Sequence, residues 1–199
     1  MHRARSGGTR AAQARSIIQP AGEESDVGEP AETLRGESVF LRRATPADAP
    51  RLGEIIATPS VAEWWGRHDP ATIVAEVIAP GDDTVVYAIE ADGQVAGIVQ
   101  YWEEDDPEYR HAGIDIFLDP ACHGRGLGAD AVRTVARHLF ADRGHHRVVI
   151  DPAADNHRAI RSYQRVGFRA VGVMRRYWRD PEGRLRDGLL MDLLPDDLT

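Results

Sequence analysis

Three glycines crowd into five positions of the segment HGRGLG, residues 123–128: Gly124, Gly126 and Gly128. A run with helical periodicity, residues 126–142, begins within the same segment. Bare backbone at the start of a helix is typical of a phosphate site, because the first N–H groups of a helix are unpaired and its dipole is positive there. The same glycines are typical of a tight strand-to-helix turn with positive φ. Taken alone, the segment indicates the two structures about equally.

The spacing of the glycines restricts the kind of phosphate ligand. A dinucleotide fingerprint reads G-x-G-x-x-G and has an acidic residue about 20 positions further on. Here the glycines read G-x-G-x-G in the middle of the chain, without that acidic residue. A Walker loop needs a lysine, and the chain contains none, which also excludes Schiff-base chemistry on this chain. A pyrophosphate cradle remains, to which Arg125 could add charge-assisted contacts.

Cysteine chemistry has little support in this sequence. Cys122 is the only cysteine, which excludes an internal disulfide framework and argues against a structural zinc site. No metal site is predicted. A nucleophilic role for Cys122 lacks a His/Asn partner pattern.

Acidic residues outnumber basic ones and favour a cationic partner. The formal net charge is −8. Residues 1–36 carry five arginines and five acidic residues, so the whole excess belongs to residues 37–199. A surface this acidic disfavours nucleic acid. The segment EEDDPE, residues 103–108, holds five carboxylates in six positions and predicts either a solvated loop or a region that attracts cations.

The length of 199 residues fits one domain with a tail. Residues 1–36 are rich in Gly, Ala, Ser, Arg and Glu without a sustained period, which predicts a disordered N-terminal extension before a folded domain over residues 37–199. No apolar run approaches the roughly 20 residues of a membrane span. No signal-peptide pattern opens the chain. We therefore expect a cytoplasmic protein that binds no membrane, as a monomer or a homodimer.

The folded part predicts a mixed α/β sheet in the order β-α-α-β-β-β-α-β-α-β-β. Strands are expected within residues 38–43, 84–91, 94–102, 111–120, 145–150, 169–178 and 184–194. Helices are expected over 45–57, within 59–80 as a short turn and a second helix, over 126–142 and over 156–168.

A second motif decides between the two interpretations of the glycines. The segment DPAADNHRAIRSYQRVGF, residues 151–168, together with HGRGLG, resembles the GCN5-related N-acetyltransferase superfamily. The resemblance covers roughly residues 38–194. In that superfamily a loop R/Q-x-x-G-x-G/A binds the pyrophosphate of acetyl-CoA, and His123 stands here where Arg or Gln is usual. The implied fold is a mixed, mostly antiparallel sheet that splays between the fourth and fifth strands and is flanked by helices.

The resemblance implies acetyl-CoA as co-substrate and assigns roles to single residues. Backbone groups of Ile116 and Leu118 would meet the pantetheine amides, with Asn156 on the other side of that arm. Tyr163 would act as general acid on the departing thiolate; its alternative is a core aromatic. The implied cofactor-binding set is Ile116, Leu118, His123, Gly124, Arg125, Gly126, Leu127, Gly128 and Asn156.

Four segments are similar to the aminoglycoside 6'-N-acetyltransferase branch: VAEWWG, YWEEDDPEYRHAGID, GRGLG and residues 151–168. The similarity implies a small cationic amine as substrate and antibiotic resistance as a role. Asp115 would be the catalytic base or amine anchor, and Asp151 a second anchor. Adjacent tryptophans rarely both point inward, so at least one of Trp64 and Trp65 should line a cleft. The implied substrate-binding set is Trp64, Trp65, Trp102, Asp115 and Asp151.

Alternative functions remain open at this point. An arginine cluster near the C-terminus is unfavourable for a cationic substrate if it faces the cleft: Arg175, Arg176 and Arg179. Similar strands occur in siderophore hydroxylysine acyltransferases, where His111 and Asp151 would do the chemistry, and in acetyltransferases of ribosomal-protein N-termini. A non-catalytic acyl-CoA-binding module is the third possibility.

Overall fold

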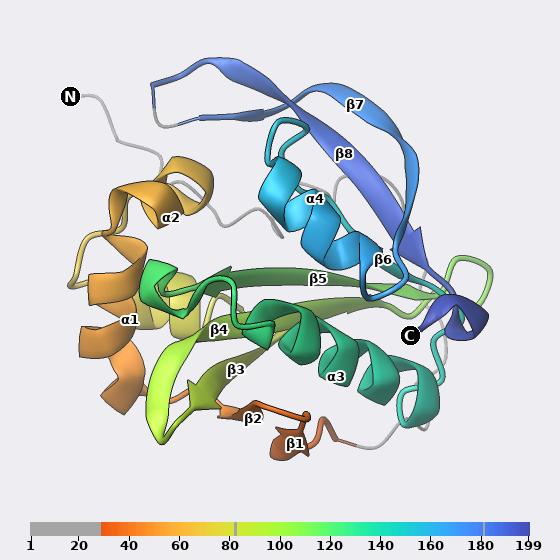
Figure 1. The fold of residues 1–199 in the computed structure, drawn as a ribbon, viewed down its shortest axis with the longest axis horizontal. Coiled ribbons are helices and arrows are strands. Elements are labelled where there is room, and N and C mark those ends of the chain that lie inside the picture. The colour runs from red at the N-terminus through yellow and green to blue at the C-terminus, as the bar shows by residue number, and fades with distance from the viewer. Residues whose placement is uncertain (1–28, 82, 181) are drawn as a thin grey trace.

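One mixed sheet organises the chain, and the computed structural model describes residues 29–81, 83–180 and 182–199 (Figure 1). The strand order is β1-β2-β3-β4-β5-β6-β8-β7, and β5–β6 is the parallel pair among antiparallel ones. The strands are β1 (Thr33–Arg35), β2 (Phe40–Arg43), β3 (Thr84–Ala91), β4 (Gln94–Glu104), β5 (His111–Leu118), β6 (Val148–Ile150), β7 (Arg169–Arg179) and β8 (Leu185–Leu193). The predicted mixed, mostly antiparallel sheet is confirmed.

Helices cover both faces of this sheet. The α-helices are α1 (Ala49–Ile56), α2 (Pro59–Trp65), α3 (Leu127–Ala141) and α4 (His157–Gln164). The apolar stripe of α3, which includes Val135 and Leu139, is buried in the larger core cluster. On the other face, α1 and α2 share a second core cluster with Ile98 and Phe117. The second helix expected within residues 59–80 is a single π-helical turn, η3 (Val74–Ile78).

The sheet begins earlier than the sequence predicts. β1 pairs antiparallel with β2, although residues 33–35 fall in the segment 1–36 that was expected to be disordered. The carboxylate of Asp130 on α3 accepts hydrogen bonds from the backbone N–H groups of residues 37–39 and so fixes the turn after β1. The prediction of disorder is therefore wrong for this short strand. Residues 1–28 of the predicted extension lie outside the described residues.

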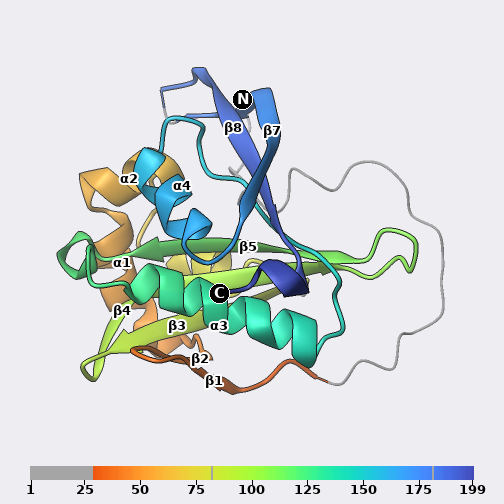
Figure 2. The same ribbon diagram turned by 45° about the vertical axis from the view of Figure 1, so that its right-hand side comes forward.

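The sheet opens between β5 and β6, which are the fourth and fifth strands expected from the sequence. They pair only at Ala112 with Val148 and at Gly113 with Val149, while β5 continues to Leu118. Figures 1 and 2 show β5 diverging from the unit of β6, β7 and β8. The predicted splay is confirmed, and it exposes one backbone edge of β5 to a cleft.

Among the described residues, no helix combines the length and hydrophobicity needed to cross a bilayer.

Candidate active site

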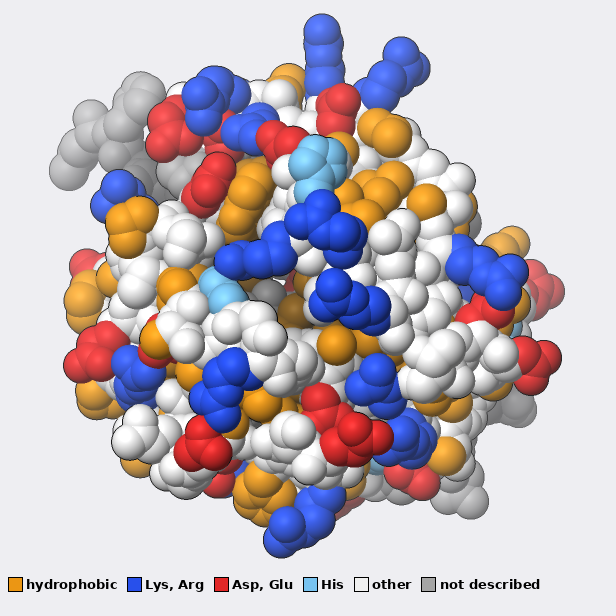
Figure 3. Space-filling view, in the orientation of Figure 1, with side chains coloured by type: hydrophobic (Ala, Val, Ile, Leu, Met, Phe, Trp, Pro, Cys, Tyr) orange, Lys and Arg blue, Asp and Glu red, His pale blue; other side chains and the backbone are white. Residues whose placement is uncertain are grey.

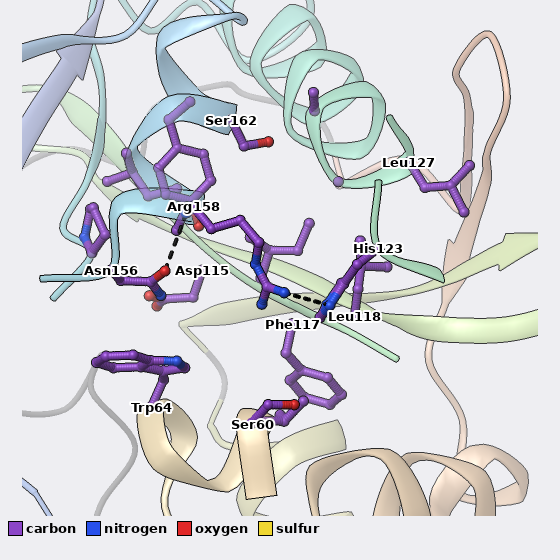
Figure 4. Close-up of a pocket in the computed structure, with 18 of the residues that line it drawn as sticks. Ser60, Trp64, Asp115, Phe117, Leu118, His123, Leu127, Asn156, Arg158 and Ser162 are labelled. Atoms are coloured by element: carbon purple, nitrogen blue, oxygen red, sulfur yellow. Dashed lines mark hydrogen bonds between the residues drawn. The ribbon is translucent and has the colours of Figure 1, made fainter. Parts of the chain in front are cut away.

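The opening between β5 and β6 is a cleft of about 270 Å³, close to the lower end of the range for ligand pockets (Figure 4). Helix α2, the loop 123–128 and helix α4 surround it. The predicted site residues that line it are Trp64, Trp65, Asp115, Ile116, Leu118, His123, Gly124, Gly126, Leu127, Gly128, Asp151, Asn156 and Tyr163. Trp102 and the side chain of Arg125 are the predicted residues outside it.

The glycine loop is a tight turn with positive φ, and its backbone lines the cleft, so its geometry is compatible with both interpretations of its sequence. Gly124 and Gly126 have φ of +78° and +80°, which L side chains rarely adopt. A Cβ at either position would meet nothing within 4 Å, so packing does not demand glycine there. The loop is a left-handed turn, and it leaves bare backbone toward the cleft at the N-terminus of the 15-residue helix α3. Anions are stabilised in such a place by free N–H groups and the helix dipole.

Arg125 does not extend its side chain into the cleft. Its guanidinium pairs with Asp92 in the β3–β4 turn at 2.6 Å, and both side chains are solvent-exposed. The side chain therefore does not line the cleft in this structure, and its contact with the phosphates stays a prediction. Asp92 lies 33 positions earlier, so no local pattern indicates this pair.

His123, the first residue of the loop, is held from two directions. Its Nδ1 lies 2.7 Å from Nη1 of Arg158 on α4. Burial, followed by the charge of Arg158, lowers the pKa of His123, whereas a hydrogen bond to the backbone of Leu118 acts in the opposite direction. The imidazole therefore favours its neutral form. Arg158 lines the cleft and was not singled out from the sequence.

The tandem tryptophans form the α2 wall of the cleft. Trp65 donates its indole N–H to the Ile116 carbonyl at 3.3 Å, and its ring meets Phe117 edge-on with 4.9 Å between centroids. Trp64 is half-buried and lines the cleft beside Ser60. Both tryptophans thus line the cleft, where the sequence required only one of them.

Two carboxylates approach the cleft from opposite sides of the splay. Asp115 lies on β5, and Nε2 of the buried Gln100 lies 3.5 Å from its Oδ2. Asp151 directly follows β6 and lines the same cleft. The structure therefore places at one cleft the two carboxylates that were predicted to anchor the amine, which lie 36 positions apart in the sequence.

Helix α4 supplies the remaining predicted side chains. Asn156 caps the helix, its Oδ1 accepting a hydrogen bond from the Ala159 N–H at 3.2 Å. Tyr163 is 9% exposed and lines the cleft, with its ring 6.1 Å from that of Phe168. Tyr163 is therefore both a core aromatic and a cleft residue.

Trp102 has a structural position outside the cleft. Its ring lies over the backbone of Gly113, where an added Cβ would come within 2.3 Å of it. It meets the ring of His111 edge-on at 5.3 Å. Neither Trp102 nor His111 lines the cleft, so this structure gives the expected acceptor contact of Trp102 no support.

The acidic segment 103–108 comprises the last two residues of β4 and the turn after it, at the opposite end of the sheet from α2 (Figures 1 and 2). Burial alone would raise the pKa of Glu103, but hydrogen bonds from His145 and Arg143 outweigh it and hold the pKa at about 2. Both oxygens of Glu103 accept bonds from Arg143, at 2.8 and 3.0 Å. Asp105 lies 3.8 Å from Arg110. These pairs and their location favour a structural loop over a cation-attracting region.

The C-terminal arginine cluster also lies outside the cleft. The side chains of Arg175, Arg176 and Arg179 are exposed on β7. The pairing with β8 is irregular between Met174 and Trp178, and Arg176 has a φ of +53° there. The cluster therefore does not oppose a cationic ligand inside the cleft.

The fold and the cleft agree with comparisons to known proteins. The acetyltransferase (GNAT) domain model matches residues 38–169, and the chain belongs to this family of acyltransferases. It is 31% identical over 161 residues to the aminoglycoside N(6')-acetyltransferase type 1 of Klebsiella pneumoniae. The aligned region covers 71% of this chain and 79% of that protein.

Two further known proteins are similar to this chain. The chain is 32% identical over 150 residues to the N-alpha-acetyltransferase RimI of Mycobacterium tuberculosis, over 74% of this chain and 89% of RimI. The structure superposes on aminoglycoside acetyltransferase AAC(6')-Ib in complex with coenzyme A and kanamycin with a TM-score of 0.66 and 26% identity, over 80% of this chain and 96% of that one.

Proposed function

We propose that this acetyltransferase transfers the acetyl group of acetyl-CoA to an amine of an aminoglycoside, in the first place the 6'-amine. The observation that carries the proposal is the meeting of Asp115 and Asp151 in a cleft walled by Trp64 and Trp65. Carboxylates can bind and deprotonate an ammonium group, and aromatic walls cover the apolar faces of a sugar. The similarity to aminoglycoside N(6')-acetyltransferase supports the same acceptor. Antibiotic resistance would follow from such an activity.

The cleft fits acetyl-CoA as the acyl donor. Gly124 and Gly126 leave open space where a Cβ would stand, at the N-terminus of α3, and this suits a pyrophosphate. Beyond Gly113 the edge of β5 that faces β6 pairs with no strand of the described residues, which suits an extended amide-bearing arm, although the Ile116 carbonyl there already accepts the Trp65 indole N–H. Acetyl-CoA supplies a thioester that an amine can attack.

The residues of the chain then have defined roles. Asp115 accepts the proton that the ammonium group must lose before its nitrogen can attack the thioester carbonyl. The new C–N bond forms as the C–S bond breaks. Tyr163 gives its phenolic proton to the departing thiolate, and the nitrogen then loses its second proton, which returns to the phenolate through water.

Replacing Tyr163 with phenylalanine tests its role as the acid. We expect kcat to fall by about 10²-fold, the lower limit typical of general acid catalysis, while acetyl-CoA affinity stays nearly unchanged because the ring still fills the core. Steady-state kinetics and calorimetry give both quantities. Tyr109, which is 65% exposed, gives a matched Tyr→Phe control that should behave as wild type. Unchanged turnover of the Tyr163 variant would remove it from the mechanism.

Acetylation of a protein N-terminus is the second candidate, favoured by the similarity to RimI.

Release of CoA thiol should be measured with kanamycin, tobramycin, an N-terminal ribosomal-protein peptide and N6-hydroxylysine as separate acceptors, against the background without acceptor. Saturable turnover of the aminoglycosides with KM in the micromolar range is expected. Turnover of the peptide or the hydroxylamine alone would contradict the aminoglycoside proposal but keep the donor site. Tight CoA binding with no turnover on any acceptor would favour a non-catalytic binding module.

A further inference from the structure

The arginines that line the cleft come from α4 and its C-terminal end, and not from the glycine loop. The loop's own arginine, Arg125, is paired with Asp92 outside the cleft. Arg158 and Arg165 of the α4 segment line the cleft. Figure 3 shows arginine side chains gathered around a hollow at the centre of this face.

Arg158 reaches across the cleft to the first residue of the loop (Figure 4). Its Nη1 lies 2.7 Å from Nδ1 of His123. A guanidinium has only donors, so the imidazole must accept at Nδ1 and is neutral in this contact. The depressed pKa of His123 is consistent with that form. In the part of the chain that the structure describes, this is the only hydrogen bond assigned to the Arg158 side chain.

We propose that Arg158 binds the pyrophosphate of the acyl carrier, and that His123 holds its guanidinium beside the glycine loop until the phosphate arrives. The inference rests on the proposed use of acetyl-CoA. Exchange of a neutral imidazole for a phosphate replaces a hydrogen bond with one charged partner by a contact between opposite charges, which can be bidentate and is stronger. The contact to His123 orients the guanidinium in advance, which lowers the entropic cost of binding.

The position of Arg158 favours the pyrophosphate over the other phosphate of CoA. His123 is the first residue of the glycine loop, and this loop leads directly into α3. The guanidinium and the N–H groups at the start of α3 thus face one region of the cleft. A phosphate bound there would be contacted from both sides, by α3 and by α4.

The test is calorimetric titration of the whole protein with CoA and with dephospho-CoA, which lacks the 3'-phosphate and keeps the pyrophosphate. For Arg158→Gln we expect Kd to rise about 10- to 100-fold for both ligands, the range for losing a charge-assisted bond. The dependence of log Kd on log salt should become shallower. Arg158→Lys, which keeps a cation that binds phosphate as a point charge, should recover part of the loss. His123→Ala should weaken binding only a few-fold.

Arg161→Gln is the matched control, because Arg161 is an exposed arginine of the same helix that does not line the cleft. Its Kd should stay within twofold of wild type. Unchanged affinity of Arg158→Gln would overturn the proposal, as would a loss for CoA without one for dephospho-CoA. An equal loss in Arg158→Lys, or in Arg161→Gln, would also overturn it by indicating general damage to α4. These measurements need no acceptor, so failure of the wild type to bind CoA would instead refute the proposed function itself.

Discussion

Substitution of Asp115 by asparagine should lower kcat/KM for the acceptor by a factor of about 10² to 10⁴, the range for losing a positioned base. Asparagine has nearly the same shape and keeps an oxygen for the contact with Gln100, so the cleft should remain intact. The substitution removes the negative charge that binds an ammonium group and the basic oxygen that accepts its proton. Steady-state kinetics with the preferred acceptor, together with CoA affinity by calorimetry, separates this loss from unfolding.

The pH dependence of this variant gives a sharper test than its rate at one pH. Without a base, turnover depends on the fraction of the acceptor amine that is already unprotonated, which increases with pH. The deficit of Asp115→Asn relative to wild type should therefore shrink as pH rises toward the pKa of the acceptor amine. Asp105→Asn is the matched control, because Asp105 is an exposed carboxylate beyond the cleft. A near-normal Asp115 variant would transfer the role of base to another carboxylate, Asp151 first.

Local sequence patterns predicted the elements of this fold well, because each pattern is contained within a single element. The period of α3 and the glycines before it predicted a helix that begins at the loop, and the structure has that helix at Leu127–Ala141. β1 was missed because three residues cannot display a period. Its position is fixed by pairing with β2 and by the anchoring of residues 37–39 on Asp130, which lies more than 90 positions away.

The candidate site shows the same difference between local and long-range information. The motifs predicted that Asp115, Asp151 and Tyr163 share one site, and the splay of β5 from β6 brings them to one cleft. The motif also included Arg125, but charge pairing with a distant turn decides where that side chain points. Arg158 was missed for the same reason, since its meeting with His123 depends on how α4 packs against the loop.

Substitution of Gly126 by valine should abolish measurable CoA binding. Gly126 caps α3 with φ of +80°, so a β-branched residue would be strained by about 1–2 kcal/mol in this backbone conformation. Space for the side chain exists, because a Cβ there would meet nothing within 4 Å. That space is the cleft itself, and the valine methyl groups would occupy the place proposed for the pyrophosphate. Calorimetric titration with CoA measures the loss directly.

Gly144 provides a control that separates backbone strain from occupation of the cleft. Its φ is +72°, an added Cβ would also meet nothing within 4 Å, and it does not line the cleft. Gly144→Val should therefore lose a similar amount of stability in thermal unfolding, yet bind CoA like wild type. If Gly126→Val retained wild-type affinity, the glycines would serve the turn alone. If both variants lost binding, the effect would come from strain in the fold, because only one of the two substitutions places atoms where the phosphate should lie.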